Sequence, residues 1–268
     1  MKKLYNLTVL IKGAGEVASG VAHRLYCAHF KVILTEITNP LAVSRGTSFC
    51  EAVWDCTKTI EGVTAELVSP NLKQIRNAWQ NAIIPIVVDP EAKIKYTIKP
   101  DVIVDATMTK KKNPTAINDA MLVIGLGPGF KAGENVHMVV ETFHNNNLGK
   151  VILNGEALPD NGLPVEIGGL GKERVIWAGF KGIFFTDKKI GDYVDKGEVI
   201  GFIYKQPVKS PLEGWLRGLV RNNVPVRKGE KLIEIDQVND NSIAWDIRSK
   251  MRSIGGGVLE AIMLNYNV

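Results

Sequence analysis

The clearest chemical pattern in the chain is the turn Gly13-Ala14-Gly15-Glu16-Val17-Ala18. The continuous apolar run at residues 7–11 predicts a strand buried on both faces directly before it. A helical apolar pattern follows the turn, and residues 32–34 predict a second strand. In such a unit Gly13 allows the tight turn and Gly15 lets a pyrophosphate approach the backbone. The free N–H groups at the start of the helix would then attract the phosphate charge.

Glu36 follows the second predicted strand, 23 residues after Gly13. A carboxylate at this place can accept hydrogen bonds from a ribose diol, and it favours a ribose without a 2′-phosphate. The pattern therefore predicts a nucleotide site made by Gly13, Ala14, Gly15, Glu16, Val17 and Glu36. The alternative is a similar fold whose turn needs its glycines but holds no ligand.

Alternating helix and strand patterns continue through the N-terminal half. Residues 72–82 predict a helix, and residues 84–88 and 102–104 predict strands. Asp105 and Thr107 come at the end of the last of these strands, where polar side chains line the crevice of a parallel sheet. They are candidate site residues, and a capping or turn role is the alternative.

A second glycine loop spans residues 125–133, between a predicted strand at 122–124 and a predicted helix at 135–142. It adds candidate phosphate contacts at Gly125, Gly127, Gly129 and Lys131. It contains no Gly-Lys-Ser/Thr and is not a P-loop. On the predicted helix His137 and Glu141 would lie one turn apart, as a proton-transfer or metal pair or simply as a polar surface.

The C-terminal half contains a repeat at an offset of 32 residues, in which 194–200 matches 226–232 and 180–184 matches 212–216. Each copy predicts two short strands around a Lys-Gly turn. The segments 191–197 and 211–214 resemble the signatures of the lipoyl/biotinyl domain. That family modifies a lysine on the hairpin between its halves. The corresponding Lys205 lacks the family's flanking residues, so we expect neither biotin nor lipoate on it.

The predicted fold class is α/β, with a Rossmann-like parallel-sheet domain and a small lipoyl/biotinyl-like β domain (a barrel-sandwich hybrid). The predicted divisions are 1–145 for the nucleotide-binding domain, 146–172 for a connecting segment, 173–238 for the β domain and 239–268 for a helical segment that packs back on the first domain. Within that last segment, residues 255–257 predict a glycine turn before a closing helix.

Composition narrows the functional classes. The net charge is +5 with basic residues mostly scattered, and no nucleic-acid-binding motif accompanies the triplet at 110–112. The three cysteines are an odd number with no zinc spacing, which predicts reduced thiols and no metal site. No apolar run is long enough to span a membrane, so we expect a cytoplasmic protein.

The whole chain resembles the selenium-dependent molybdenum hydroxylase system proteins of the YqeB type. The resemblance rests on four segments, at residues 12–15 with 20–25, 48–53, 123–130 and 254–262. It implies an accessory role in the maturation of molybdenum hydroxylases that carry selenium, with a nucleotide or the molybdopterin cytosine dinucleotide as ligand. The implied partners are the hydroxylase or its cofactor-assembly proteins.

Two other functional classes stay open. An NAD-dependent oxidoreductase of a small substrate would suit Glu36 and the first turn, although no pair of residues suited to hydride chemistry is evident. A non-catalytic interaction module would use the β domain beside a vestigial nucleotide fold. No catalytic residue is predicted, and a homo-oligomer is compatible with all three classes.

Overall fold

The computed structural model describes residues 4–109, 114–238 and 240–267, and the chain divides into two compact units. Unit 1 comprises Met1–Pro40, Ser48–Asn161 and Ile247–Val268, and unit 2 comprises Leu41–Thr47 and Gly162–Asp246. The boundaries differ from the predicted divisions in three places. Residues 41–47 belong to unit 2, and the predicted connecting segment is divided after Asn161 between the two units. The residues between the β domain and Ile247 belong to unit 2, although the prediction had them pack on the first domain.

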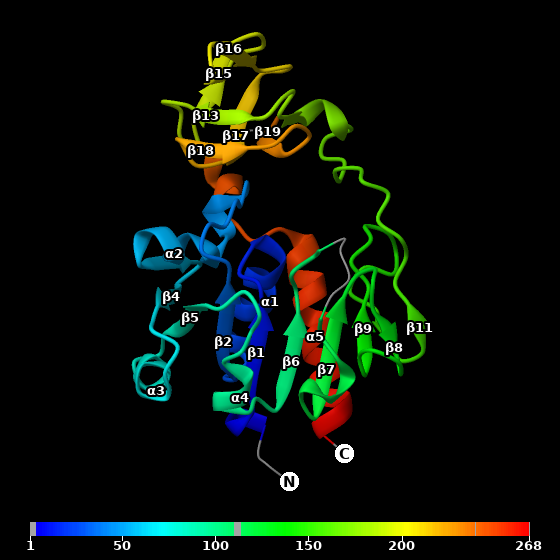
Figure 1. Ribbon diagram of the computed structural model, residues 1–268. Helices are drawn as coiled ribbons and strands as arrows, with labels where there is room; N and C mark the ends of the chain where they lie inside the picture. Colours follow the sequence, from blue (N-terminus) through cyan, green and yellow to red (C-terminus); the bar gives the residue numbers. More distant parts are fainter. Residues whose placement is uncertain (1–3, 110–113, 239, 268) are drawn as a thin grey trace. The chain divides into compact units, whose positions relative to one another are not determined.

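Unit 1 is built on a nine-stranded sheet with the order β10-β9-β7-β6-β1-β2-β5-β4-β3 (Figure 1). Seven neighbouring strands run parallel, and β3 and β10 pair antiparallel at the two edges. The strands of this sheet are β1 (Thr8–Lys12), β2 (Lys31–Glu36), β3 (Thr57–Ile60), β4 (Val63–Leu67), β5 (Ile84–Val88), β6 (Val102–Asp105), β7 (Leu122–Leu126), β9 (Met138–Val140) and β10 (Val151–Ile152). The short strands β8 (Lys131–Ala132) and β11 (Gly155–Glu156) form a separate pair.

The strand order reverses at β1. Along the chain the sheet first grows from β1 to β2 on one side, and it later continues from β6 to β7 on the other. The central strands are continuous apolar runs because both faces of a parallel sheet are covered. This reversal leaves the carboxyl ends of β1 and β6 as neighbours, where ligands of open α/β sheets bind.

Helices cover both faces of this sheet. The helices of unit 1 are α1 (Glu16–Cys27), α2 (Ala52–Asp55), α3 (Leu72–Gln80), α4 (Lys95–Ile98) and α5 (Ser249–Tyr266). α1 and α5 pack side by side, whereas Ile75 of α3 joins the core cluster of Leu10 and Ile33 on the other face. The close packing of α1 on α5 needs glycine, because a Cβ on Gly20 would lie 2.6 Å from Cβ of Met251.

Two sequence predictions in unit 1 are wrong. Residues 135–142 form no helix, because Met138–Val140 is the parallel strand β9 in register with β7. The glycines at 255–257 form no turn and lie inside the continuous helix α5. A Cβ on Gly257 would lie 2.0 Å from the carbonyl oxygen of Gly149, so this glycine serves close packing instead.

Unit 2 contains two four-stranded antiparallel sheets, with the orders β12-β19-β17-β14 and β16-β15-β13-β18. Its strands are β12 (Val175–Trp177), β13 (Gly182–Phe185), β14 (Tyr193–Val194), β15 (Val199–Ile203), β16 (Gln206–Lys209), β17 (Gly214–Leu219), β18 (Val224–Val226) and β19 (Lys231–Asp236). The repeat appears directly in the strands, since β13 and β15 recur as β17 and β19 at the 32-residue offset. β14 and β18 are the short strands that follow β13 and β17 in the two copies. Each pairs with the other copy, β14 with β17 and β18 with β13.

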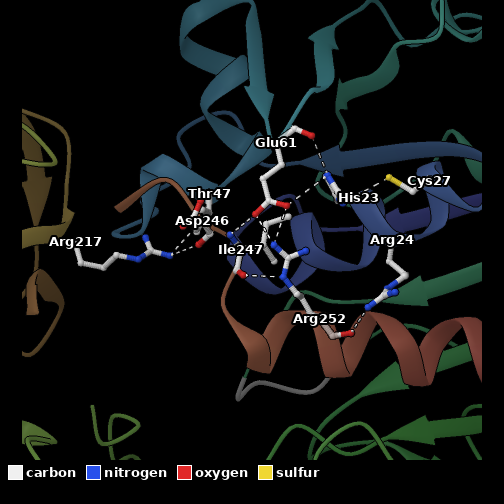
Figure 2. A network of polar contacts seen from close by, with 9 residues as sticks. All are labelled: His23, Arg24, Cys27, Thr47, Glu61, Arg217, Asp246, Ile247 and Arg252. Atoms are coloured by element: carbon white, nitrogen blue, oxygen red, sulfur yellow. Dashed lines mark hydrogen bonds and ion pairs between the residues drawn. The ribbon is translucent and has the colours of Figure 1, made fainter. Parts of the chain in front are cut away.

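The segment 41–47 is held in unit 2 by β17. The backbone N–H of Leu219 donates to the carbonyl of Val43 at 2.9 Å. Arg217, whose side chain is fully buried, donates to Oγ1 of Thr47 at 3.0 Å and to the carbonyl of Asp246 at 3.4 Å (Figure 2). These long-range contacts explain why the segment does not stay with its chain neighbours.

Candidate functional site

The predicted site residues of the first half meet at the carboxyl edge of the unit 1 sheet. In the parallel ladder Lys12 of β1 is level with Asp105 of β6, and Asp105 is level with Gly125 of β7. On the other side Lys12 is level with Thr35, one residue before Glu36. The parallel register therefore brings both glycine loops, Glu36 and Asp105 to one edge.

The first turn leaves β1 at Gly13 and enters α1 at Gly15. Gly13 has φ +91°, a region that glycine adopts readily and other residues rarely. A Cβ on Gly15 would meet no atom within 4 Å, so the space above this residue is open. Glu16 and Val17, in the first turn of α1, are half-buried. The turn thus offers an accessible backbone at a helix N-terminus, as predicted for an anion site.

Ala14, between the two glycines, is fully buried and held from three sides. Its N–H donates to Oε2 of Glu36 at 2.8 Å. Its carbonyl accepts from the N–H of Cys50 at 2.8 Å and from the hydroxyl of Ser19 at 3.0 Å. The turn is therefore anchored at its centre, which preorganises the flanking backbone for a ligand.

Glu36 occupies its predicted place at the end of β2. Besides Ala14, its carboxylate accepts from the N–H of Ile37 at 2.8 Å. Burial raises the pKa of Glu36, and the two backbone hydrogen bonds lower it by less. Each carboxylate oxygen can accept more than one hydrogen bond, so this side chain can still receive ribose hydroxyls.

Lys12 and Thr115 complete the site and were missed by the sequence analysis. Nζ of Lys12 lies 2.7 Å from Oδ2 of Asp105 and also bonds the hydroxyl of Thr115, which donates to the same carboxylate. Thr107 donates to Oδ1 of Asp105 through its hydroxyl at 2.7 Å. The sequence did contain a signal for this pair, because Lys12 ends one apolar run and Asp105 ends another.

Asp105 is fully buried, and burial alone would raise its pKa. The charge of Lys12 and the hydrogen bonds from Lys12, Thr115 and Thr107 outweigh burial, and they hold the pKa of Asp105 below its ordinary value. The group is therefore a carboxylate paired with an ammonium, between the two glycine loops.

The second glycine loop differs in what surrounds its glycines. A Cβ on Gly125 would lie 2.2 Å from the ring of Phe130, and one on Gly127 would lie 2.4 Å from Oγ1 of Thr142. Gly129 has open space but φ +97°. Nζ of Lys131 is 2.5 Å from Oε1 of Glu134, and its side chain is 43% exposed. No helix follows this loop, so it lacks the N–H groups that such a helix would add.

His137 and Glu141 do not form a pair. Nδ1 of His137 accepts from the N–H of Val123 at 3.0 Å, and burial lowers the pKa of this imidazole. Glu141 accepts from the backbone N–H groups of residues 142, 143 and 158. Both side chains satisfy backbone groups around β9.

Three further observations concern a metal site, a membrane-spanning helix and the modification of Lys205, none of which the sequence predicts. The described residues contain no group of three or more His, Cys, Asp or Glu placed to hold a metal ion. No helix in the described part of the chain has the length and apolar character needed to cross a membrane. Lys205 lies in the two-residue turn between β15 and β16, with Tyr204, and is exposed.

A curated relative covers nearly the whole chain. The chain is 40% identical, over 256 residues, to "Uncharacterized protein YqeB" of Escherichia coli (strain K12). The match includes 96% of this chain but 47% of the relative, so the chain spans about half the length of that protein. The comparison supports the resemblance to YqeB-type proteins. No family model matches the sequence.

Comparison with solved structures gives only distant likenesses. The apo and product-bound structures of the ectoine utilization protein EutE (DoeB) from Ruegeria pomeroyi are 9% and 11% identical, with TM-scores of 0.26 and 0.27; both matches cover 86% of this chain, and 86% and 85% of those chains. A succinylglutamate desuccinylase from Silicibacter sp. is 10% identical, with 86% of this chain and 84% of that chain covered and a TM-score of 0.24. These scores are too low to support a conclusion about fold or function.

Proposed function

We propose that the carboxyl edge of the unit 1 sheet binds the pyrophosphate and a ribose of a nucleotide, and that the chain is an accessory protein for the maturation of selenium-dependent molybdenum hydroxylases. The observation that carries the binding proposal is the first turn. Its backbone is open above Gly15, it begins a twelve-residue helix, and Glu36 lies beside it.

Two fold assignments accompany this proposal. We infer a Rossmann-like unit 1, because β5-β2-β1-β6-β7 is a parallel run whose order reverses at β1. We infer a lipoyl/biotinyl-like unit 2, because two copies of one strand pattern exchange partners between two antiparallel sheets.

Different groups at this edge would bind different parts of the nucleotide. The N–H groups at the start of α1 receive the pyrophosphate over Gly15. Glu36 accepts hydrogen bonds from the ribose hydroxyls, which favours a ligand without a 2′-phosphate. The buried pair of Lys12 and Asp105, with Thr115 bonded to both, fixes the end of β1 from which the turn starts. The second loop flanks the same edge and is a secondary contact.

The maturation role rests on the resemblance to YqeB-type proteins. A molybdopterin cytosine dinucleotide contains the pyrophosphate and the unmodified ribose that this edge suits, and NAD contains both as well. The partners are then a molybdenum hydroxylase or its cofactor-assembly proteins. A clear preference for NAD would favour the alternative of an oxidoreductase.

The test is a binding measurement on the purified full chain. NAD, ATP, CTP and isolated molybdopterin cytosine dinucleotide are titrated by calorimetry and by thermal shift. Gly15→Val is the key variant, because Gly15 has φ −69° and open space, so a valine fits the backbone and fills the phosphate approach. We expect the affinity to fall at least about a hundredfold, while the unfolding temperature without ligand stays within a few degrees.

Each outcome separates the hypotheses. Tight binding of the molybdopterin dinucleotide that Gly15→Val removes supports the proposal. If Gly15→Val binds the ligand as tightly as the unchanged protein, the site is not at the first turn. If none of the four ligands binds, the nucleotide site is wrong and the interaction module stands.

A further inference from the structure

A cysteine, a histidine and a glutamate lie in line at the surface of α1 (Figure 2). Sγ of Cys27 lies 3.8 Å from Nδ1 of His23. Nε2 of the same ring lies 3.4 Å from the carbonyl oxygen of Glu61 and 3.9 Å from its Oε2. His23 and Cys27 are four residues apart on α1, so the helical repeat itself keeps them on one face.

The surroundings of the ring decide which nitrogen carries the proton. Nε2 faces two oxygen atoms of Glu61, both of them acceptors, so the N–H belongs there. Nδ1 then presents its lone pair to the thiol of Cys27. The imidazole side chain is 13% exposed, so it is held in place, whereas Cys27 itself is open to solvent.

Glu61 is in turn held by α5. Arg252 donates to both of its carboxylate oxygens, at 2.6 and 2.9 Å, and the N–H of Ile247 donates to Oε1 at 2.8 Å. Burial would raise the pKa of this carboxyl, but the contacts with Arg252, Ile247 and His23 together lower it. Glu61 is therefore a carboxylate at neutral pH, and it is held where its oxygen atoms face Nε2 of His23.

Two arginines belong to the same polar network (Figure 2). Arg252 of α5 pairs with Glu61, and Arg24 of α1 donates to the carbonyl of Arg252 at 3.3 Å. In this network the group in contact with the sulfur of Cys27 is the imidazole of His23.

We propose that Cys27 is a nucleophilic thiol that undergoes exchange with small disulfides, with His23 as its base and Glu61 as a positioning residue. Nδ1 of His23 takes the thiol proton, and the thiolate attacks one sulfur of the disulfide. A bond forms between Sγ of Cys27 and that sulfur as the original S–S bond breaks. The displaced sulfur leaves as a thiolate and takes the proton from His23. Cys27 is oxidised to the mixed disulfide, and the leaving sulfur is reduced.

The chain provides its own control. Cys56, which directly follows α2, is also exposed, and among the described residues no histidine contacts its thiol. Cys50 is 1% exposed and out of reach of a reagent. A comparison of Cys27 with Cys56 in one molecule therefore removes differences in protein concentration, reagent and folding.

The test uses the reduced full chain and glutathione disulfide, with the modified cysteine located by peptide mass spectrometry over a range of pH. We expect Cys27 to react about tenfold faster than Cys56 at pH 7, because Cys27 has a base beside its thiol that can take the proton. The rate at Cys27 should also persist to lower pH than the rate at Cys56. His23→Gln should bring Cys27 to the rate and pH profile of Cys56, and Glu61→Gln should move it part of the way.

Protection of the buried Cys50 from the reagent reports whether each variant keeps its fold. Equal rates at the two cysteines of the unchanged protein would overturn the proposal, and so would a His23→Gln protein in which Cys56 is unaffected and Cys27 stays fast. Either result is independent of nucleotide binding, since the Gly15→Val protein should retain the fast exchange at Cys27.

Discussion

The two glycine loops of unit 1 lie at the same edge of one sheet, yet their glycines do different things. In the first loop a Cβ on Gly15 would meet nothing, and a helix begins there. In the second, Gly125 lies under the ring of Phe130 and Gly127 lies against Thr142. Glycine is thus kept in the first loop for access to the backbone, and at Gly125 and Gly127 of the second loop for packing. The first loop offers a phosphate open backbone at a helix N-terminus, whereas the second has open space around Gly129 but no helix after it.

The largest expected effect concerns the ion pair that separates the two loops. Asp105→Asn should lower the free energy of unfolding by about 3–5 kcal/mol, because it removes the carboxylate from a buried ammonium at Lys12. Chemical denaturation at neutral pH measures this loss. A loss below about 1 kcal/mol would contradict the importance of the pair.

The stabilisation by the Lys12–Asp105 pair should depend on pH. Because the folded-state pKa of Asp105 is lowered, its stabilisation is complete above the unfolded pKa of about 3.9. It is lost as the pH falls towards the lower folded value. The difference in stability between the unchanged protein and Asp105→Asn should therefore shrink in acid and stay constant above about pH 5.

A second prediction tests the packing role of the second loop. Gly125→Ala should destabilise the protein by about 1–3 kcal/mol, since its Cβ would overlap the Phe130 ring and the strand cannot move away. The double variant Gly125→Ala with Phe130→Leu is the control, because the smaller side chain should recover part of the loss. A stable Gly125→Ala protein with weakened nucleotide binding would instead make this loop a ligand site.

These contrasts also show how far the sequence could predict the molecule. Buried parallel strands are continuous apolar runs, and the strand predicted at 84–88 coincides with β5. The first turn was predicted from its local pattern. The helix predicted at 135–142 was wrong because residues 138–140 gain more from pairing with β7, a contact that is distant in the chain.

The sequence analysis missed several contact residues for a similar reason. Lys12 marks the end of an apolar run in the sequence, and only the pairing of β1 with β6 places it on Asp105. Thr115 comes ten residues after Asp105, beyond the end of β6, and no local pattern marks it. Likewise Glu61 reaches His23 only because the turn after β3 lies beside α1. Each of these contacts depends on tertiary structure that no local sequence pattern shows.

Glu36→Gln should separate stability from binding at the first turn. We expect the nucleotide affinity to fall about tenfold, the loss of one hydrogen bond to a charged acceptor. The amide oxygen of glutamine can still accept from Ala14, so the turn should persist. Calorimetry with the preferred nucleotide measures the change, and an unchanged affinity would remove Glu36 from the site.

The direction of the stability change in Glu36→Gln follows from the pKa of Glu36. The folded-state pKa of Glu36 is raised, so ionising this carboxyl costs stability as the pH rises from its unfolded value of about 4.3 through the folded value. Glu36→Gln removes that cost. At neutral pH the variant should therefore be at least as stable as the unchanged protein while it binds its ligand less well.

The smallest expected effect is that of Lys131→Ala in the second loop. Lys131 is half-exposed and paired with Glu134, and an exposed ion pair contributes less than about 1 kcal/mol. We expect less than a threefold change in nucleotide affinity and no measurable change in stability, with Glu134→Ala as the matched control. If Lys131→Ala instead weakens binding tenfold at low salt and the effect fades as salt is added, Lys131 leaves Glu134 to contact a phosphate. The two loops would then share the ligand, and the distinction between an access loop and a packing loop would hold only for the glycines themselves.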